Sequence, residues 1–312
     1  MEPSEIAQKA QKVIQAVETT IIGKTETVEL ALSILFSNGH LLIEDIPGVG
    51  KTTLAKALSR ALGLTFKRIQ FTPDLLPSDI TGSSIYNQKA GEFEVREGPI
   101  FANIVLADEI NRTTPKTQAA LLECMEERQV TIDGVGHKLP DPFFVLATQN
   151  NIELAGTYPL PEAQLDRFTA RISMGYPDRA SEMSILTSHR HAHPVDSVPI
   201  VLNAAEIVEI QKAVRHIHVD ENVQGYIVDV VAATRTLPMV SLGASTRGTQ
   251  NLLYACQALA ALQGRNFVKP DDVKRLAHSV LAHRIIVRPE QRVRGVTAEH
   301  CVNEAIASIA VP

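Results

Sequence analysis

The chain has 312 residues, of which 45% are hydrophobic and 21% charged, a composition typical of globular proteins and not of disordered or fibrous ones. A single core stops growing near about 250 to 300 residues, so the length favours two folded units. The formal net charge is −5, and the first 176 residues carry 16 Lys and Arg against 22 Asp and Glu. This balance argues against a surface that binds nucleic acid or anionic membranes.

The cysteines and the N-terminus indicate the compartment. Cys124, Cys256 and Cys301 are too far apart to form a disulfide framework or a metal knuckle, which predicts free thiols in a reducing environment. The first residues are acidic and carry no signal-peptide pattern, and the apolar runs are too short to cross a bilayer. We therefore expect a soluble cytoplasmic protein without a membrane span.

The first part of the chain alternates helical and strand patterns. Ser4 is positioned to cap a helix whose apolar residues recur every three or four positions, and a second helix is expected over residues 25–38. Five short apolar segments then predict strands, with a helix after the first of them over residues 51–62: residues 40–44, 66–70, 104–107, 143–148 and 170–174. Short apolar strands alternating with helices predict a doubly wound α/β domain with a parallel sheet, over residues 1–177.

Two segments interrupt this alternation. Residues 83–86 and 92–95 flank a polar turn, and residues 129–132 and 136–139 flank Asp133 and Gly134. An Asp-Gly turn between short strands favours a β-hairpin. Both hairpins are predicted as surface inserts, where interactions with partners are often located.

The remaining chain is predicted to be helical. Residues 178–202 form a linker in this interpretation, and residues 203–312 an all-α domain with helices near residues 204–217, 221–236, 246–264, 271–283 and from 298 onward. Three histidines alternate in the linker at positions 189, 191 and 193. Because no Cys or acid cluster lies nearby to complete a metal site, a plain linker is the favoured interpretation.

A phosphate-binding loop follows the first strand. Its residues are Pro47, Gly48, Val49, Gly50, Lys51, Thr52 and Thr53, and they stand between a predicted strand and a predicted helix. Glycines let backbone N–H groups face phosphate oxygens, Lys51 reaches the outer phosphates, and the Thr52 hydroxyl can bind Mg²⁺. Asp45 stands where the strict pattern has glycine, so the loop must turn there without one.

Polar residues follow two later strands. Asp108 and Glu109 end the strand at 104–107, where Asp108 can bind Mg²⁺ and Glu109 can act as general base toward water. Asn150 follows the strand at 143–148, and parallel strands bring all these ends to one edge. The alternative is that the two acids and the Asn merely cap their turns.

These motifs together resemble the MoxR family of AAA+ ATPases. The resemblance rests on Ile22-Gly23, the phosphate loop, residues 106–112, residues 147–150 and, most specifically, residues 156–168 with the sequence GTYPLPEAQLDRF. It covers nearly the whole chain. The fold it implies is a P-loop parallel sheet flanked by helices, followed by a smaller helical lid.

The resemblance also implies roles for individual residues. Asn150 would be the sensor 1 residue, and Arg167 an arginine finger on the neighbouring subunit's nucleotide. Arg247, in a segment similar to sensor 2, would contact the γ-phosphate from the lid, although Thr246 stands where the family usually has proline. Ile22 and Gly23 would lie against the adenine. The alternatives are a salt bridge for Arg167 and a solvated helix-start charge for Arg247.

The implied function is ATP hydrolysis with Mg²⁺, in an assembly expected to be a hexamer. The energy would serve to remodel or mature partner proteins or to assist metal insertion, with a von Willebrand factor A domain protein as the expected partner. The two hairpins resemble inserts of a clade that also contains magnesium chelatase subunits and minichromosome maintenance helicases. Two alternatives remain: a nucleic-acid motor or loader, which the acidic balance disfavours, and a nucleotide-dependent binding switch with little turnover.

Overall fold

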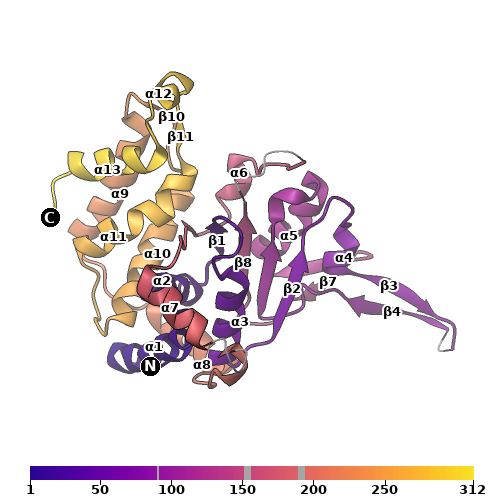
Figure 1. Ribbon diagram of the computed structural model, residues 1–312. Coiled ribbons are helices and arrows are strands. Elements are labelled where there is room, and N and C mark those ends of the chain that lie inside the picture. The colour runs from indigo at the N-terminus through magenta and orange to yellow at the C-terminus, as the bar shows by residue number, and fades with distance from the viewer. Residues whose placement is uncertain (90, 151–155, 189–193) are drawn as a thin grey trace.

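The computed structural model describes residues 1–89, 91–150, 156–188 and 194–312. At its centre is a parallel sheet of five strands in the order β2-β5-β8-β1-β9 (Figure 1). In chain order these are β1 (Leu41–Glu44), β2 (Phe66–Gln70), β5 (Ile104–Asp108), β8 (Phe144–Gln149) and β9 (Ala170–Ile172). The predicted doubly wound parallel sheet is thus confirmed, and its strand ends lie along one edge.

Alternate residues of each strand pack on opposite faces of the sheet. On β1, Leu41 and Ile43 join one core, whereas Leu42 joins the other. The first face is covered by α1 (Pro3–Glu18), α2 (Thr25–Phe36) and α3 (Lys51–Ala61). The second face is covered by α4 (Pro77–Thr81) and α5 (Pro115–Glu127). Burial on both faces explains why β1, β5 and β8 are largely apolar in sequence. The expectation of a fully apolar strand was wrong for β2, which lies at the edge of the sheet and exposes Lys67, Arg68 and Gln70.

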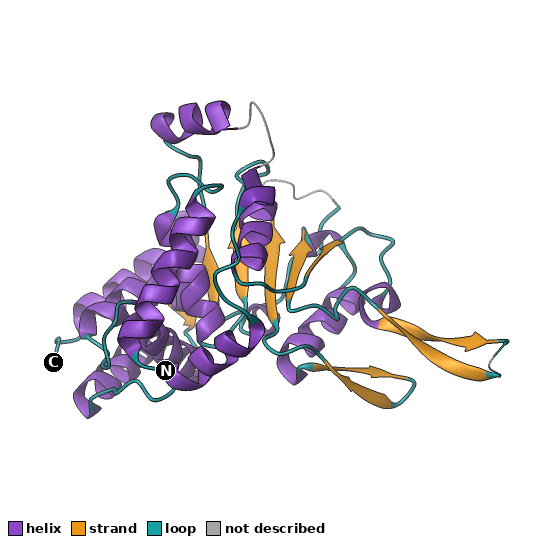
Figure 2. Cartoon of the chain, turned by 90° about the horizontal axis from the view of Figure 1, so that it is seen from below, coloured by secondary structure: helices purple, strands orange, loops and turns teal. Residues whose placement is uncertain are grey.

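The two predicted hairpins are present. The first pairs β3 (Gly82–Asn87) with β4 (Glu92–Glu97), and the second pairs β6 (Gln129–Ile132) with β7 (Val135–Lys138). Both extend from the same end of the α/β domain, as seen from below in Figure 2. The first hairpin exposes Tyr86 and Phe93, whose rings lie 5.2 Å apart.

The C-terminal lid consists of α8 (Ala204–Val214), α9 (Glu221–Thr236), α10 (Thr246–Leu262), α11 (Pro270–Leu281), α12 (Pro289–Val293) and α13 (Ala298–Ser308). As predicted, Asn203 caps α8, where its side chain accepts from the amide of Glu206. The lid is not purely helical, because β10 (Val240–Leu242) and β11 (Ile286–Val287) form a small antiparallel pair. Its helices share one continuous hydrophobic core with α1, α2 and the first face of the sheet.

Three local predictions were wrong. The first helix begins at Pro3 and not after a Ser4 cap, because proline suits the first helical position. The predicted linker contains α7 (Arg179–Ser188) and a 3₁₀ turn, η2 (Pro194–Ser197). Strand β9 ends at Ile172 instead of Met174, because Ser173 and Met174 turn away to hydrogen-bond Asp45.

The histidines at positions 189, 191 and 193 lie outside the described residues, so the alternative of a metal site in the linker stays untested. Within the part of the chain that the structure describes, we find no helix with the length and apolar character needed to cross a bilayer.

Candidate active site

The phosphate loop connects β1 to α3 and borders an open cavity of about 360 Å³. Gly48 and Gly50 have φ angles of +86° and +92°, a region that side chains with a Cβ rarely adopt. A Cβ at Gly48 would meet no atom within 4 Å. Backbone conformation and not space therefore requires glycine there. The cavity is lined by Pro47, Gly48, Gly50, Lys51, Thr52, Thr53, Arg68, Asp108, Glu109 and Asn150.

Lys51 begins α3 and points back along the loop. Its Nζ donates a hydrogen bond of 2.7 Å to the backbone oxygen of Asp45. Burial lowers the pKa of Lys51, while the nearby carboxylates of Asp45, Asp108 and Glu109 act in the opposite direction. The ammonium group is thus held at the phosphate cavity among three acids, where an anionic ligand can replace the carbonyl as its partner.

Asp108, the last residue of β5, is held from both sides. The Thr148 hydroxyl on β8 donates to its Oδ1 over 2.6 Å, and the Arg68 guanidinium on β2 contacts its Oδ2 at 2.7 Å. Thr148 also accepts a 2.8 Å hydrogen bond from the amide of Glu109. One hydroxyl therefore sets the positions of both predicted acids.

Glu109 has left-handed backbone angles, with φ 58° and ψ 49°, a conformation uncommon for residues other than glycine and often found at functional sites. Its carboxylate accepts a hydrogen bond of 2.9 Å from the side chain of Gln70 and forms an ion pair of 3.1 Å with the guanidinium of Arg112. The side chain is a quarter exposed. The carboxylate thus stays accessible at the cavity while two donors fix it.

The donors at this cavity suit Mg²⁺. Thr52 offers a hydroxyl and Asp108 a carboxylate, the hard oxygen ligands that this ion prefers. Among the described residues there is no group of three or more His, Cys, Asp or Glu side chains that could hold a metal. A Mg²⁺ ion held here would take the Asp108 carboxylate and the Thr52 hydroxyl, with phosphate oxygens of a nucleotide as further ligands.

Asn150 directly follows β8 and is 4% exposed. It lines the phosphate cavity, and its backbone oxygen accepts 3.0 Å from the side chain of Asn111. The structure therefore places Asn150 at the same cavity as Lys51, Thr52 and Asp108, at the ends of neighbouring strands.

A second pocket of 250 Å³ adjoins the phosphate loop and could take a nucleobase. It is lined by Thr20, Ile21, Ile22, Lys24, Gly48, Val49, Gly50, Thr53 and Pro177. Ile22, which is predicted to lie against the adenine, lines this pocket. Gly23 instead packs against α7 with φ +75°, where a Cβ would come within 2.3 Å of the Ser181 hydroxyl oxygen.

Arg167 and Arg247 lie together, on a different part of the surface. Both form ion pairs with Glu126 at the end of α5, at 3.0 Å and 2.5 Å. The hydrogen bond from Arg247 contributes most to lowering the pKa of Glu126, and the charge of Arg167 adds to it. The described residues that line the phosphate cavity include neither arginine.

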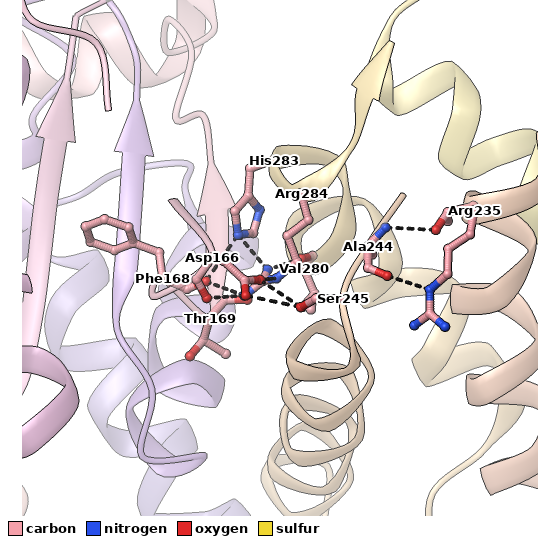
Figure 3. A network of polar contacts seen from close by, with 10 residues as sticks. Asp166, Phe168, Thr169, Arg235, Ala244, Ser245, Val280, His283 and Arg284 are labelled. Carbon is pink, nitrogen blue, oxygen red and sulfur yellow. Dashed lines mark hydrogen bonds and ion pairs between the residues drawn. The ribbon is translucent and has the colours of Figure 1, made fainter. Parts of the chain in front are cut away.

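A partly buried polar network joins the segments that carry these two arginines (Figure 3). Asp166 accepts a hydrogen bond of 2.7 Å from Arg284, whose side chain is 1% exposed. It accepts a second hydrogen bond, of 3.1 Å, from the hydroxyl of Ser245. Arg284 also donates 2.6 Å to the backbone oxygen of Phe168. Burial lowers the pKa of Arg284 to about 10, against the effect of Asp166, so the group stays charged near pH 7. Arg167 and Arg247 are thereby fixed as one unit.

Comparison with known proteins identifies the family of the chain. Residues 40–170 match the model of the ATPase family associated with various cellular activities, and residues 232–305 match the AAA lid domain. Chaperone MoxR1 of Mycobacterium tuberculosis is 39% identical over 97% of this chain and 82% of its own length. The chain belongs to the MoxR family of AAA+ ATPases. It is therefore an ATPase, as predicted.

A second MoxR relative and a solved structure extend the comparison over most of the chain. Protein MoxR of Methylorubrum extorquens is 31% identical, covering 88% of this chain and 86% of its own. A crystal structure from Cytophaga hutchinsonii superposes with a TM-score of 0.92 at 37% identity, covering 99% of this chain and 97% of that one. The α/β core followed by a lid is thus shared by this chain and the Cytophaga hutchinsonii protein.

Several residues at the site of this MoxR-family ATPase escaped the sequence reasoning. Arg68 and Gln70 alternate along β2 and contact the two acids, and Glu126 binds both arginines. For the β2 pair a signal existed, because three of the five residues of this strand are polar, whereas a strand buried on both faces is apolar. For Glu126, one acid among several on an amphipathic helix, no local signal existed.

Proposed function

We propose that ATP binds with its phosphates at the loop and its adenine in the adjoining pocket beside Ile22. The backbone N–H groups of residues 48–52 and Lys51 would hold the phosphates, as the start of a helix favours. Thr52 and Asp108 would hold Mg²⁺, which neutralises phosphate charge when bound. These roles are supported by the gathering of all these groups around one cavity.

Glu109 serves in this proposal as the general base toward the attacking water, and Asn150 as the polar contact to the water or the γ-phosphate. A base must lie within hydrogen-bond reach of the proton it takes. The carboxylate of Glu109 is accessible at the cavity, and its amide is bound to Thr148 beside Asp108. This keeps base and metal ligand at neighbouring positions.

We further propose that Arg167 acts on the nucleotide of a neighbouring copy, and that Arg247, predicted to contact the γ-phosphate from the lid, acts in the same assembled site. Their shared contact with Glu126, apart from the residues lining their own phosphate cavity, is the observation that carries this proposal. Two permanent planar charges suit the charge that develops on a transferring phosphoryl group. Hydrolysis would then depend on assembly, for which a hexameric ring is the expected form.

As a working function, the ATPase remodels or matures partner proteins in the cytoplasm, including by assisting metal insertion. A relative that matches nearly the whole chain is named a chaperone, and the exposed hairpins offer surfaces for such contacts. The three buried free thiols suit a reducing compartment. A protein with a von Willebrand factor A domain is the proposed partner.

Mixing two inactive variants tests the shared site. Glu109→Gln removes the base but keeps both arginines, and Arg167→Ala removes an arginine but keeps the base. Each alone should lose ATP hydrolysis while still binding ATP, and the mixture should regain activity, because some sites combine an intact base with an intact arginine. Two Arg167→Ala preparations mixed together are the control. No recovery in the mixed sample would refute action between subunits.

The partner proposal has a separate test. Hydrolysis by the wild-type protein should rise when a von Willebrand factor A protein is added, and not when DNA is added at moderate salt. Stimulation by DNA alone would instead favour the motor or loader alternative.

A further inference from the structure

Asp45, which stands in place of the first glycine of the phosphate loop, makes hydrogen bonds in several directions. Its N–H donates 3.2 Å to the backbone oxygen of Gln149, which continues the β1–β8 ladder. Its backbone oxygen accepts the 2.7 Å hydrogen bond from Lys51. Its carboxylate Oδ1 accepts 2.8 Å from the amide of Ile46. The residue thus connects the sheet, the loop and the phosphate-binding lysine.

The other carboxylate oxygen binds the segment that leaves β9. Oδ2 accepts 2.9 Å from the Ser173 hydroxyl, 2.5 Å from the amide of Met174 and 2.7 Å from the amide of Gly175. Partial burial acts to raise the pKa of Asp45. These hydrogen bonds and the one from Ile46 outweigh burial and hold the pKa below its usual value. Asp45 therefore accepts these hydrogen bonds as an ionised carboxylate.

Backbone conformation does not explain the choice of residue here. Asp45 is absent from the residues with positive φ, and its N–H is part of a sheet ladder. Glycine would be tolerated at such a position but would gain nothing from its freedom. What aspartate supplies is an acceptor for Ser173, Met174 and Gly175.

The segment bound by Asp45 also meets the nucleobase pocket. Pro177 lines that pocket, as does Lys24. The Lys24 ammonium group donates to the backbone oxygen of Met174 and, over 3.0 Å, to that of Tyr176. Residues 173–177 are consequently tied to the phosphate loop at one end and border the base pocket at the other.

We propose that Asp45 is a positioning residue for nucleotide binding. Its carboxylate clamps residues 173–175 to the start of the phosphate loop, so that the order of residues 173–177, which border the base pocket, depends on the nucleotide. Residues 173–177 lead directly from β9 into α7, the first element after the α/β domain. The clamp therefore links occupancy of the site to the chain that leads toward the lid.

The test compares Asp45→Gly with Asp45→Asn. Asp45→Gly restores the strict loop pattern but removes the clamp, so the Kd for a fluorescent ATP analogue and the KM for ATP should rise roughly tenfold, the effect of losing charge-assisted hydrogen bonds. The kcat at saturating ATP should stay within about threefold, because Asp108 and Glu109 are unchanged. Asp45→Asn keeps one acceptor oxygen and should fall between wild type and Asp45→Gly.

Hydrogen exchange supplies a readout that a loss of folding stability alone would not move. In the wild type, the nucleotide should slow exchange in residues 173–177, which include the amides of Met174 and Gly175. In Asp45→Gly these amides should exchange fast even at saturating nucleotide, while β5 and β8 keep their protection. Retained protection in residues 173–177, or ATP binding as tight as that of the wild type, would overturn the proposal.

Ser173→Ala offers a milder perturbation should Asp45→Gly fold poorly. It removes one of the three hydrogen bonds to Oδ2 and should weaken nucleotide binding roughly twofold to threefold. Added to Asp45→Asn, it should cost less than it does in the wild type, because the two residues act through the same contact. Full additivity of the two changes would count against the clamp. This proposal rests on the proposed nucleotide site. ATP hydrolysis by the wild type is measured separately, so that failure of the clamp can be distinguished from failure of that site.

Discussion

A buried histidine at the start of β1, the strand that leads into the phosphate loop, should make the folding stability of this ATPase sensitive to acid. His40 precedes β1 and is 4% exposed. Its Nε2 lies 3.1 Å from the backbone oxygen of Met125, and its Nδ1 accepts 3.1 Å from the amide of Val145. A ring that donates at one nitrogen and accepts at the other is neutral.

The size of the effect follows from the pKa. Burial, and then the charge of Arg128, lower the pKa of His40 from 6.5 to about 3. A depressed histidine pKa means that the unfolded chain takes up a proton below pH 6.5 whereas the folded chain does not, so stability falls as the pH decreases from 6.5 toward 3. Between pH 7.5 and pH 5, His40 alone should lower the free energy of unfolding by about 2 kcal/mol.

Urea denaturation at the two pH values measures this contribution. His40→Gln carries a donor and an acceptor but does not titrate, so its loss of stability between pH 7.5 and pH 5 should be smaller than that of the wild type by about 2 kcal/mol. The same substitution at the exposed His216 is the control. Identical pH dependence in His40→Gln and wild type would refute the assignment of a neutral buried ring.

Three further substitutions test the site. Thr148→Val removes the hydroxyl that positions Asp108, so kcat should fall roughly tenfold while the ATP Kd changes little, as stopped-flow and steady-state assays would show. Arg68→Met removes a cation that competes for Asp108, and titration should show half-maximal hydrolysis at roughly threefold less Mg²⁺. Glu126→Gln weakens the hold on Arg247, and hydrolysis at limiting protein concentration should rise roughly threefold. A change in the opposite direction would contradict the reasoning in each case.

The sequence predicted the site where the chemistry follows strand ends. The apolar run at residues 104–107 is buried on both faces of the sheet, and its continuous hydrophobicity makes it recognisable. The strand at residues 66–70 carries three polar residues and buries only Ile69. Because parallel strands share a direction, placing Asp108 and Asn150 at one edge needed no knowledge of tertiary contacts. Lys51 and Thr52 followed from the loop pattern.

What the sequence left open depends on contacts between distant segments. The pairing of Arg167 and Arg247 through Glu126 joins residues more than 40 and 120 positions apart, respectively, and local patterns carry no such information. Strands β10 and β11 are too short to show alternation. The apolar residues of α7 are only weakly gathered on one face of the helix. The sequence therefore predicted a linker there.

The continuous core that runs from the first face of the sheet through α1 and α2 into the lid limits how this subunit can move. A lid that swung open to uncover about 400 Å² of apolar surface would lose about 10 kcal/mol, comparable to the whole stability of a typical domain. A wide hinge within one subunit is therefore disfavoured. Each copy should instead turn nearly as a rigid body, and in the proposed assembly the strain of a hydrolysis cycle would be released where one copy contacts the next.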